Sequence, residues 1–178
     1  KVWTRTYDNK GNVLTKTDPL NHATTNTYDR AGLLKTVTDA LNNVTQYSYD
    51  ARGNILSVTD PYGAVTKYEY NADNQRTKVT DPENRVQQYE YDLDGRLVKI
   101  VDGNGNVIQY VYGDEASGLN NLLVKIVYPT FTQEHKYDNR NRLTQAINVV
   151  DATIRLTTAN TYNGVGKLAT TTDAANRT

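Results

Sequence analysis

The strongest constraint on the fold of this chain is an internal repeat marked by tyrosine. Among its 178 residues, six tyrosines follow one another at intervals of 21 residues, and two more continue the series at intervals of 25. They are Tyr7, Tyr28, Tyr49, Tyr70, Tyr91, Tyr112, Tyr137 and Tyr162. A fixed period of this length is typical of proteins built from stacked supersecondary units, each of which buries a face against its neighbours. The repeat therefore sets the architecture.

Two positions of each repeat hold residues that tolerate a positive φ at little cost, namely Gly and Asn. The fourth position after each Tyr is Gly11, Gly32, Gly53, Asn74, Gly95, Asn141 and Gly166, and a five-residue insertion moves it to Asn121 in the sixth repeat. The fourteenth position is Asn21, Asn42, Gly63, Asn84, Gly105 and Asn176. We predict a sharp reversal at each position, so that every repeat contains two turns and two strands.

The residues around these positions predict the turn types. The first turn reads Tyr-Asp-x-x-Gly, in which Asp opens a type I turn and Gly closes it as a bulge. The second reads Asp-Pro-x-Gly, clearest at residues 60–63, where Pro61 fixes φ of the second turn position. A short strand such as 34–39 or 55–60 lies between the turns. A longer strand such as 65–70 or 86–91 follows the second turn.

Alternation along the longer strand predicts one aromatic face and one mostly polar face. Thr66, Tyr68 and Tyr70 share the first face, whereas Lys67 and Glu69 share the second with Val65. The longer strand is therefore expected to present different chemistry on its two sides.

The shorter strand leaves two alternatives open. Leu97 and Ile100 are both apolar but differ in parity, so a regular strand cannot point both to the same face. Either a bulge brings the two side chains to one face, or apolar residues are buried on both faces.

Successive hairpins predict an antiparallel meander. We count sixteen strands, which at ~4.7 Å spacing would extend about 75 Å, and open twisted sheets rarely exceed ~10 strands without curling. The predicted fold class is all-β, with tandem antiparallel β-hairpin repeats forming a long curled sheet. Residues 1–178 read as a single repeat array cut within the repeats at both ends, and hence as a fragment of a longer array.

Composition supports a thin layer and excludes several functions. Leu, Ile, Val and Phe make up only 38 residues, whereas Tyr, which buries a ring while keeping its hydroxyl near water, occurs 14 times. Twenty basic and twenty acidic residues give no basic surface for nucleic acid. No apolar stretch approaches the ~20 residues of a membrane span. The absence of Cys excludes disulfides and thiolate metal sites.

The sequence predicts no catalytic, cofactor-binding or metal-binding residue. His22 and His135 are the only histidines and occupy unrelated repeat positions, so they suggest neither a metal site nor a catalytic pair. The repeated Asp residues occupy turn positions that explain them. We expect the repeated Tyr and Gly residues to be structural, and Gly118, in the insertion, to tolerate substitution better than Gly63.

Residues 49–70 resemble the YD repeat of the Rhs family, because the turns, the Tyr pair and the spacing coincide. That family includes bacterial Rhs and wall-associated proteins, C components of insecticidal toxin complexes, and teneurins. The resemblance covers essentially the whole chain. It departs at two longer repeats, 112–137 and 137–162, where we expect enlarged turns in an unbroken sheet. The resemblance implies a segment of a hollow β-shell that in bacterial members commonly encloses a C-terminal toxin domain.

The resemblance also implies the setting: a secreted or cell-surface bacterial protein, whose partners are the remainder of the shell and the enclosed C-terminal domain. The alternative is a cell-surface adhesion or carbohydrate-binding module, because Tyr faces suit sugar stacking. Asp60-Pro61-Tyr62-Gly63 resembles the start of an aspartyl self-cleavage motif found at the end of such shells. Because Ala64 replaces the Leu of that motif and the segment lies mid-array, we expect a repeat turn there.

Overall fold

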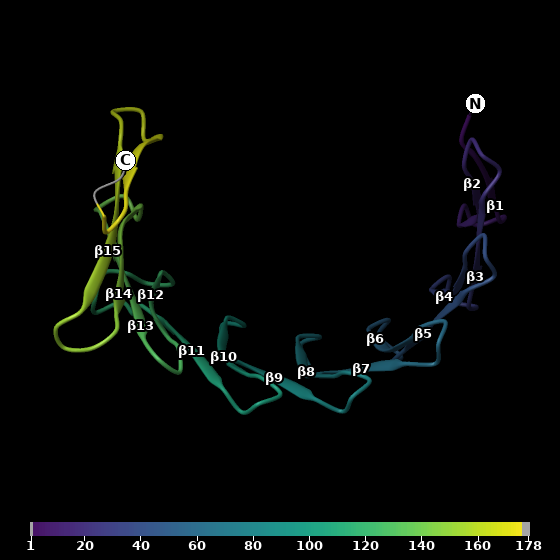
Figure 1. Cartoon of the computed structure of the whole chain (residues 1–178), viewed down its shortest axis with the longest axis horizontal. Coiled ribbons are helices and arrows are strands. Elements are labelled where there is room, and N and C mark those ends of the chain that lie inside the picture. The colour runs from purple at the N-terminus through teal and green to yellow at the C-terminus, as the bar shows by residue number, and fades with distance from the viewer. Residues whose placement is uncertain (1, 176–178) are drawn as a thin grey trace. The chain divides into compact units, whose positions relative to one another are not determined.

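The computed structural model describes residues 2–175, which contain sixteen β-strands and, within that range, no helix (Figure 1). The strands follow one another in chain order in one unclosed sheet. This confirms the predicted all-β class of tandem antiparallel hairpins. Asn176, one of the predicted turn residues, lies outside the described residues.

The strands are β1 (Thr4–Tyr7), β2 (Val13–Thr17), β3 (Ala23–Tyr28), β4 (Leu34–Thr38), β5 (Val44–Tyr49), β6 (Ile55–Thr59), β7 (Val65–Tyr70), β8 (Arg76–Thr80), β9 (Val86–Tyr91), β10 (Leu97–Val101), β11 (Val107–Tyr112), β12 (Leu123–Val127), β13 (Thr132–Tyr137), β14 (Leu143–Val149), β15 (Arg155–Tyr162) and β16 (Leu168–Thr172). The chain divides into two compact units, residues 1–87 and 88–178. The first unit contains β1–β8, and the second contains most of β9 and all of β10–β16.

Both turns of a repeat have the same backbone geometry. In a first turn, the Asp50 N–H donates to the Asn54 carbonyl at 2.9 Å and the Gly53 N–H donates to the Asp50 carbonyl at 3.1 Å. In a second turn, Asp60 bonds in the same way to the residues three and four positions later, at 3.1 and 2.9 Å. The φ angles are +89° at Gly53 and +84° at Gly63, so each turn closes with a left-handed residue, as the spacing predicts.

The bulge is the correct alternative for the shorter strand. In β10, Leu97 pairs with Tyr91 and Ile100 pairs with Tyr89, and the register shifts between Leu97 and Lys99. One extra residue therefore sits in β10, and Leu97 and Ile100 face the same side as the two tyrosines. The same shift recurs beside the first turn of the other repeats, with Leu14, Lys35, Leu56, Thr77, Val124, Thr144 and Ala169 as the extra residues.

The register also assigns the faces within each unit. In the first unit Tyr47 pairs with Val58, and Val58 pairs with Thr66 on the next strand. Since paired residues share a face and alternate residues along a strand do too, Tyr49 and Tyr70 lie on the same side of the sheet. We call this the tyrosine face. In the second unit the pairing of Tyr89, Ile100 and Ile108 carries the tyrosine face from β9 to β11.

The opposite side, the polar face, carries matched cross-strand pairs one position before six of the eight repeat tyrosines. Ser48 and Ser57 hydrogen-bond through their hydroxyls at 2.6 Å, and the same place in the next repeat holds a 2.8 Å ion pair between Glu69 and Lys78. Other repeats place Thr6–Thr15, Thr27–Thr36, Glu90–Lys99 and Thr161–Thr170 there. In these six repeats both members of the pair change together, which keeps the face polar and paired. The exceptions are Val111 opposite Lys125 and Lys136 opposite Gln145.

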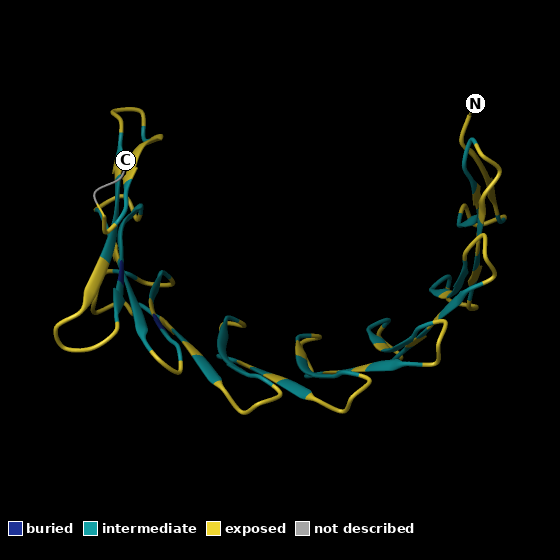
Figure 2. Ribbon diagram, viewed as in Figure 1, coloured by how far each residue is buried: buried dark blue, intermediate teal, exposed yellow. Residues whose placement is uncertain are grey.

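The sheet has almost no fully buried core. Among the described residues only Ile126 and Ile147 are buried apolar side chains, at 8% and 5% exposure, and most strand residues are half-buried (Figure 2). Composition predicts this thin layer. Stability must therefore come from many partly buried cross-strand contacts and from the turns, because little apolar area is removed from water at any one position.

The two longer repeats differ from each other. In repeat 112–137 the insertion enlarges the first turn, which spans residues 113–121, while the second turn is shortened so that the Tyr128 N–H donates to the Phe131 carbonyl. In repeat 137–162 the strands lengthen instead: β14 has 7 residues and β15 has 8. The expectation of an enlarged turn is right for the first repeat and wrong for the second. The four extra residues of this repeat are divided between the two paired strands β14 and β15. Because each strand gains an even number of residues, the same side chains continue to point to the same face of the sheet.

Candidate functional site

The repeated aspartates are held by their own turns. The Asp50 Oδ1 accepts hydrogen bonds from the N–H groups of Arg52 and Asn54, both at 2.9 Å, while Oδ2 accepts one from the Asn54 side chain at 2.9 Å. These hydrogen bonds, the Asn54 side chain first, hold the pKa of Asp50 below its ordinary value. A carboxylate engaged in this way stabilises a turn and is poorly placed to act as a general base.

The charge of the aspartate is not required for this arrangement. Asn71 replaces Asp in one first turn, and its Oδ1 accepts the N–H groups of Asp73 and Gln75 at 3.0 Å. Asn163 does the same for Val165 and Lys167. The role that the repeats share is therefore that of a hydrogen-bond acceptor.

Each first turn is followed by a bulge, and the bulge explains why the repeat residue is Tyr. The Tyr49 hydroxyl donates to the carbonyl of Leu34, the residue before the bulge in the preceding repeat, at 2.8 Å. Burial raises the pKa of Tyr49. A bulge locally disrupts the backbone ladder, so a carbonyl beside it benefits from another donor. We call this contact the tyrosine latch, since it joins one hairpin to the next.

The latch recurs at Tyr28 with Val13 (2.9 Å), Tyr112 with Leu97 (3.1 Å), Tyr137 with Leu123 (2.7 Å) and Tyr162 with Leu143 (2.8 Å). Sequence reasoning assigned these tyrosines to packing and missed the hydroxyl bond. The signal that could have found it is the presence of Tyr at all eight repeat positions in a chain with one Phe. A purely packing role would accept either ring.

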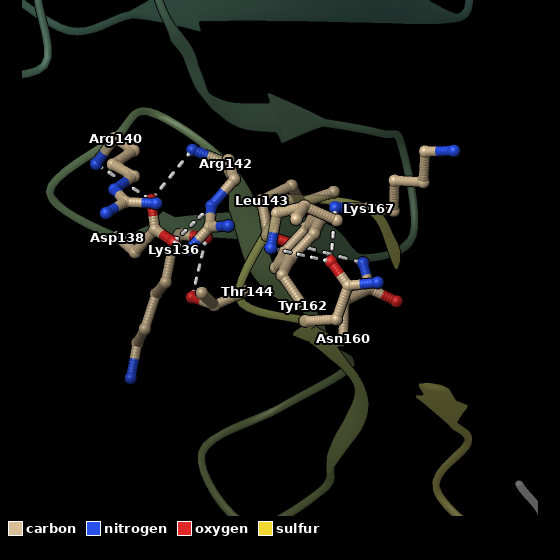
Figure 3. A network of polar contacts seen from close by, with 11 residues as sticks. Lys136, Asp138, Arg140, Arg142, Leu143, Thr144, Asn160, Tyr162 and Lys167 are labelled. Carbon is tan, nitrogen blue, oxygen red and sulfur yellow. Dashed lines mark hydrogen bonds and ion pairs between the residues drawn. The ribbon is translucent and has the colours of Figure 1, made fainter. Parts of the chain in front are cut away.

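An arginine strengthens the latch in two repeats. The Arg142 Nε and Nη2 atoms donate to Asp138 Oδ2 at 2.7 and 2.6 Å, and the guanidinium lies over the Tyr162 ring at 4.5 Å (Figure 3). The Arg142 side chain lowers the pKa of Asp138 to about 2. The same guanidinium thus contacts the turn of one repeat and the latch tyrosine of the next.

The second instance of this arrangement connects to the enlarged turn. Arg96 pairs with Asp92 at 2.7 Å and Asp94 at 3.2 Å, and lies 4.7 Å from the centre of the Tyr112 ring. Its Nη1 donates to the side chain of Asn121, which has a positive φ and closes the enlarged turn. Arg96 therefore anchors the enlarged turn to the repeat before it.

Shallow grooves lie between neighbouring first turns. The turns after Tyr28 and Tyr49 enclose a groove of about 800 Å³, and those after Tyr49 and Tyr70 enclose an equivalent one of about 590 Å³. Both are open to solvent along their length.

The histidines lie in separate surroundings. His22 pairs with Asp18 at 2.8 Å in a second turn. His135 contacts the Leu123 carbonyl and the Gln133 side chain, both at 2.9 Å. Across residues 2–175 no three His, Asp or Glu side chains gather as a metal site would require. Within the same span, no helix has the length and apolar character needed to cross a membrane.

The segment that resembles a self-cleavage motif is a repeat turn. The Tyr62 and Ala64 N–H groups both donate to Asp60 Oδ1 at 2.8 Å, and the Gly63 N–H donates to the Asp60 carbonyl. These bonds match those of the other second turns.

Turns, bulges, latches and paired faces, repeated in register, define a tandem β-hairpin repeat protein. The family model named RHS Repeat matches residues 28–65, 55–86, 70–107 and 91–130, which together span more than half of the chain. The chain belongs to the RHS repeat family, as the resemblance of residues 49–70 indicated.

Solved structures agree on the fold. A crystal structure of TcdB2-TccC3-Cdc42 matches with a TM-score of 0.79 at 17% identity, covering 97% of this chain and 11% of the other. TcdB2-TccC3 without its hypervariable C-terminal region gives 0.80 at 17% identity, with the same 97% and 11% coverage. The Tc holotoxin pore of Photorhabdus luminescens, mutated in TccC3, gives 0.72 at 20% identity and covers 90% and 10%.

The chain thus spans about a tenth of the length of the toxin chains that it matches. At such identities the likeness shows a shared Rhs-type fold. No curated protein sequence matches the chain.

Proposed function

We propose that this chain is a non-catalytic segment of the wall of an Rhs-type β-shell, and that the shell encloses a C-terminal toxin or other cargo. The observation that carries this proposal is the tyrosine latch. At five of the eight repeat tyrosines it joins one hairpin to the next, so these conspicuous side chains already have a structural role in the sheet. A catalytic site would need convergent polar groups free of such roles.

The likeness to toxin-complex structures supports the setting. One of those structures lacks a hypervariable C-terminal region, which indicates that such a region belongs to that toxin protein. We propose by analogy that the partners of this chain are the remainder of its shell and an enclosed C-terminal domain. By the same analogy we propose that the protein acts outside or at the surface of a bacterial cell.

The sheet geometry suits a wall. It is one hairpin layer thick, carries a tyrosine face and a polar face, and covers a large area with few residues. Direct hydrogen bonds also join neighbouring first turns. The Lys10 ammonium donates to the Arg30 carbonyl at 3.1 Å, and Arg52 donates to the Ala72 carbonyl at 2.5 Å. Such a layer can separate two compartments without a thick core.

The alternative, an adhesion or carbohydrate-binding module, depends on tyrosines that are available to a sugar. Five of the eight repeat tyrosines donate their hydroxyls to backbone carbonyls of the preceding repeat. Those hydroxyls are already engaged as donors, so the structural role accounts better for this row of residues.

Deletion of one repeat tests the proposal. In the longer protein that contains this chain, removing residues 50–70 should expose the C-terminal domain to protease, because two strands, β6 and β7, are lost from the wall. The matched controls Asp60→Asn and Asp81→Asn keep a hydrogen-bond acceptor in the turn and should leave both protection and toxin activity unchanged. Full protection after the deletion, or lost activity in an intact Asp60→Asn shell, would refute the proposal.

A further inference from the structure

The groove between the first turns after Tyr28 and Tyr49, here called the upstream groove, combines a partly apolar lining with cations. Leu33, Tyr47 and Tyr49 contribute apolar surface. Its volume of about 800 Å³ lies in the range of small-molecule sites. A planar or ring-shaped body could rest against this lining.

Three cationic side chains, Arg30, Lys35 and Arg52, also line the upstream groove. Elsewhere some cations are paired with carboxylates, for example Lys78 with Glu69 and Arg142 with Asp138. Within residues 2–175 neither Arg30 nor Lys35 forms an ion pair with a carboxylate. Both are exposed at the groove and free to receive an anion.

The carboxylates of the upstream groove are directed into their own turns. Asp29 accepts the Leu33 N–H at 2.9 Å, and Asp50 accepts two N–H groups and the Asn54 side chain. Of the three cations, Arg52 already donates to the Ala72 carbonyl of the next turn. Among the described residues Arg30 and Lys35 have no carboxylate partner, and the two carboxylates of the groove are held by their own turns.

The repeat provides an internal comparison. In the downstream groove, between the turns after Tyr49 and Tyr70, Leu56 stands where the upstream groove has Lys35, and Glu69 stands where it has Ser48. Ala51 takes the repeat position of Arg30. The two grooves share backbone geometry but differ in charge. The cations of the upstream groove are therefore not demanded by the repeat fold.

From this contrast we infer that the upstream groove binds a small organic anion, with a carboxylate or phosphate group held by Arg30 and Lys35 and its ring or apolar body resting against Tyr47 and Leu33. Arg30 offers a planar fork suited to an oxyanion, and Lys35 offers a point charge. This site is independent of encapsulation, since it needs only two neighbouring hairpins.

Calorimetric titration of the whole chain at low salt tests the site with glucuronate, glucose and inorganic phosphate as probes. Glucuronate should bind saturably, glucose should not bind at the same concentrations, and phosphate should bind more weakly because it lacks a ring. Replacing Arg30→Ala and Lys35→Leu together should lower glucuronate affinity by about tenfold or more. The control pair Arg140→Ala and Lys136→Leu, which removes the same charge outside the groove, should leave affinity unchanged.

A gain-of-function variant keeps the test decisive if the double variant unfolds. Ala51→Arg with Leu56→Lys and Glu69→Ser gives the downstream groove the counterparts of Arg30 and Lys35 and removes its glutamate, and should add a second glucuronate site to the otherwise unchanged chain. Equal binding of glucose and glucuronate would overturn the anion assignment. Phosphate binding as tight as glucuronate would overturn the role of the lining. Full glucuronate affinity in the Arg30 and Lys35 double variant would overturn the location.

Discussion

At the scale of single residues, the repeat is a set of hydrogen-bond assignments made in the same register along the chain. Asp or Asn accepts turn N–H groups, Gly or Asn supplies the positive φ, and Tyr donates to the carbonyl beside the bulge of the previous repeat. Each residue type is explained by a recurring contact, which for Tyr is observed at five of the eight repeat positions. This is why the series tolerates Asp-to-Asn and Gly-to-Asn exchanges between repeats, but no exchange of Tyr for Phe.

The tyrosine latch predicts a difference between two tyrosines of the same chain. Tyr49→Phe should destabilise its hairpin by about 1 kcal/mol, because the Leu34 carbonyl loses its hydroxyl donor. Tyr62→Phe should have no measurable effect, since Tyr62 is 92% exposed at the tip of a second turn. Hydrogen exchange of the β4 and β5 amides measures the difference. Equal hydrogen-exchange protection of these amides in the two variants would show that the Tyr49 hydroxyl does not stabilise the hairpin.

The Asp138 carboxylate predicts a pH dependence. Its pKa is about 2 in the folded chain, below the ordinary value of 3.8, because Arg142 donates to it. A lowered folded pKa contributes stability that is present above the unfolded pKa and is lost as the pH falls from about 4 towards 2. Asp138→Asn should therefore be less stable than the wild type at pH 7, with the difference disappearing near pH 2. A difference that stays constant in thermal melts across this range would contradict the assignment.

At the scale of elements, each repeat is a hairpin whose two reversals are interchangeable in geometry. The first and second turns share the same two backbone hydrogen bonds although their sequences differ. Proline is optional, as Ala40 shows in the turn opened by Asp39. What both turns of the 21-residue repeats share is the left-handed residue at the end, whereas the second turns at 128–131 and 150–154 close without one.

The sequence suggests Gly118 as the tolerant control for substitution of Gly63, but Gly164 is the better control. Gly118 has a φ of +69°, so it is as constrained as the repeat glycines and is not the tolerant position expected of an insertion. Gly164 has no neighbour within 4 Å and no positive φ. Gly63→Val should cost more than about 1 kcal/mol and Gly164→Val much less, as measured by denaturant unfolding. Similar losses at both positions would remove the turn assignment.

Much of the fold could be predicted because the 21-residue period locates the turns, and the positions of the turns set where each strand begins and ends. The strand expected at 55–60 is observed as Ile55–Thr59. The bulge was undecided, since the parity of Leu97 and Ile100 allows two structures and only the pairing with β9 chooses between them. The latch was not predicted, because its acceptor is a carbonyl of the preceding repeat. The lengthened β14 and β15 were missed for a similar reason: extra residues fit a turn or two strands equally well.

At the scale of the whole chain, stability should be uneven. Repeat arrays are held by nearest-neighbour contacts, and each hairpin here contributes a thin, half-buried layer. The described residues with buried apolar side chains, Ile126 and Ile147, lie in β12 and β14 of the second unit. These strands should therefore show the strongest protection in that unit.

Two isoleucines seven residues apart test this expectation. Ile147→Ala should cost about 3 kcal/mol, because its side chain is 5% exposed and leaves a cavity. Ile154→Ala should cost little, since Ile154 is 46% exposed in the turn between β14 and β15. Local hydrogen exchange of β13–β15 measures both. Equal losses of protection would show that the layer has no preferred centre.

The central claim is that this chain forms a segment of the wall of a larger shell. Electron cryomicroscopy of the longer protein that contains the chain tests this claim most directly. We expect residues 28–130 to lie in a continuous wall of antiparallel strands, with density for the C-terminal domain on the enclosed side. A map in which these residues form an exposed, open array, with the C-terminal domain outside it, would contradict the account.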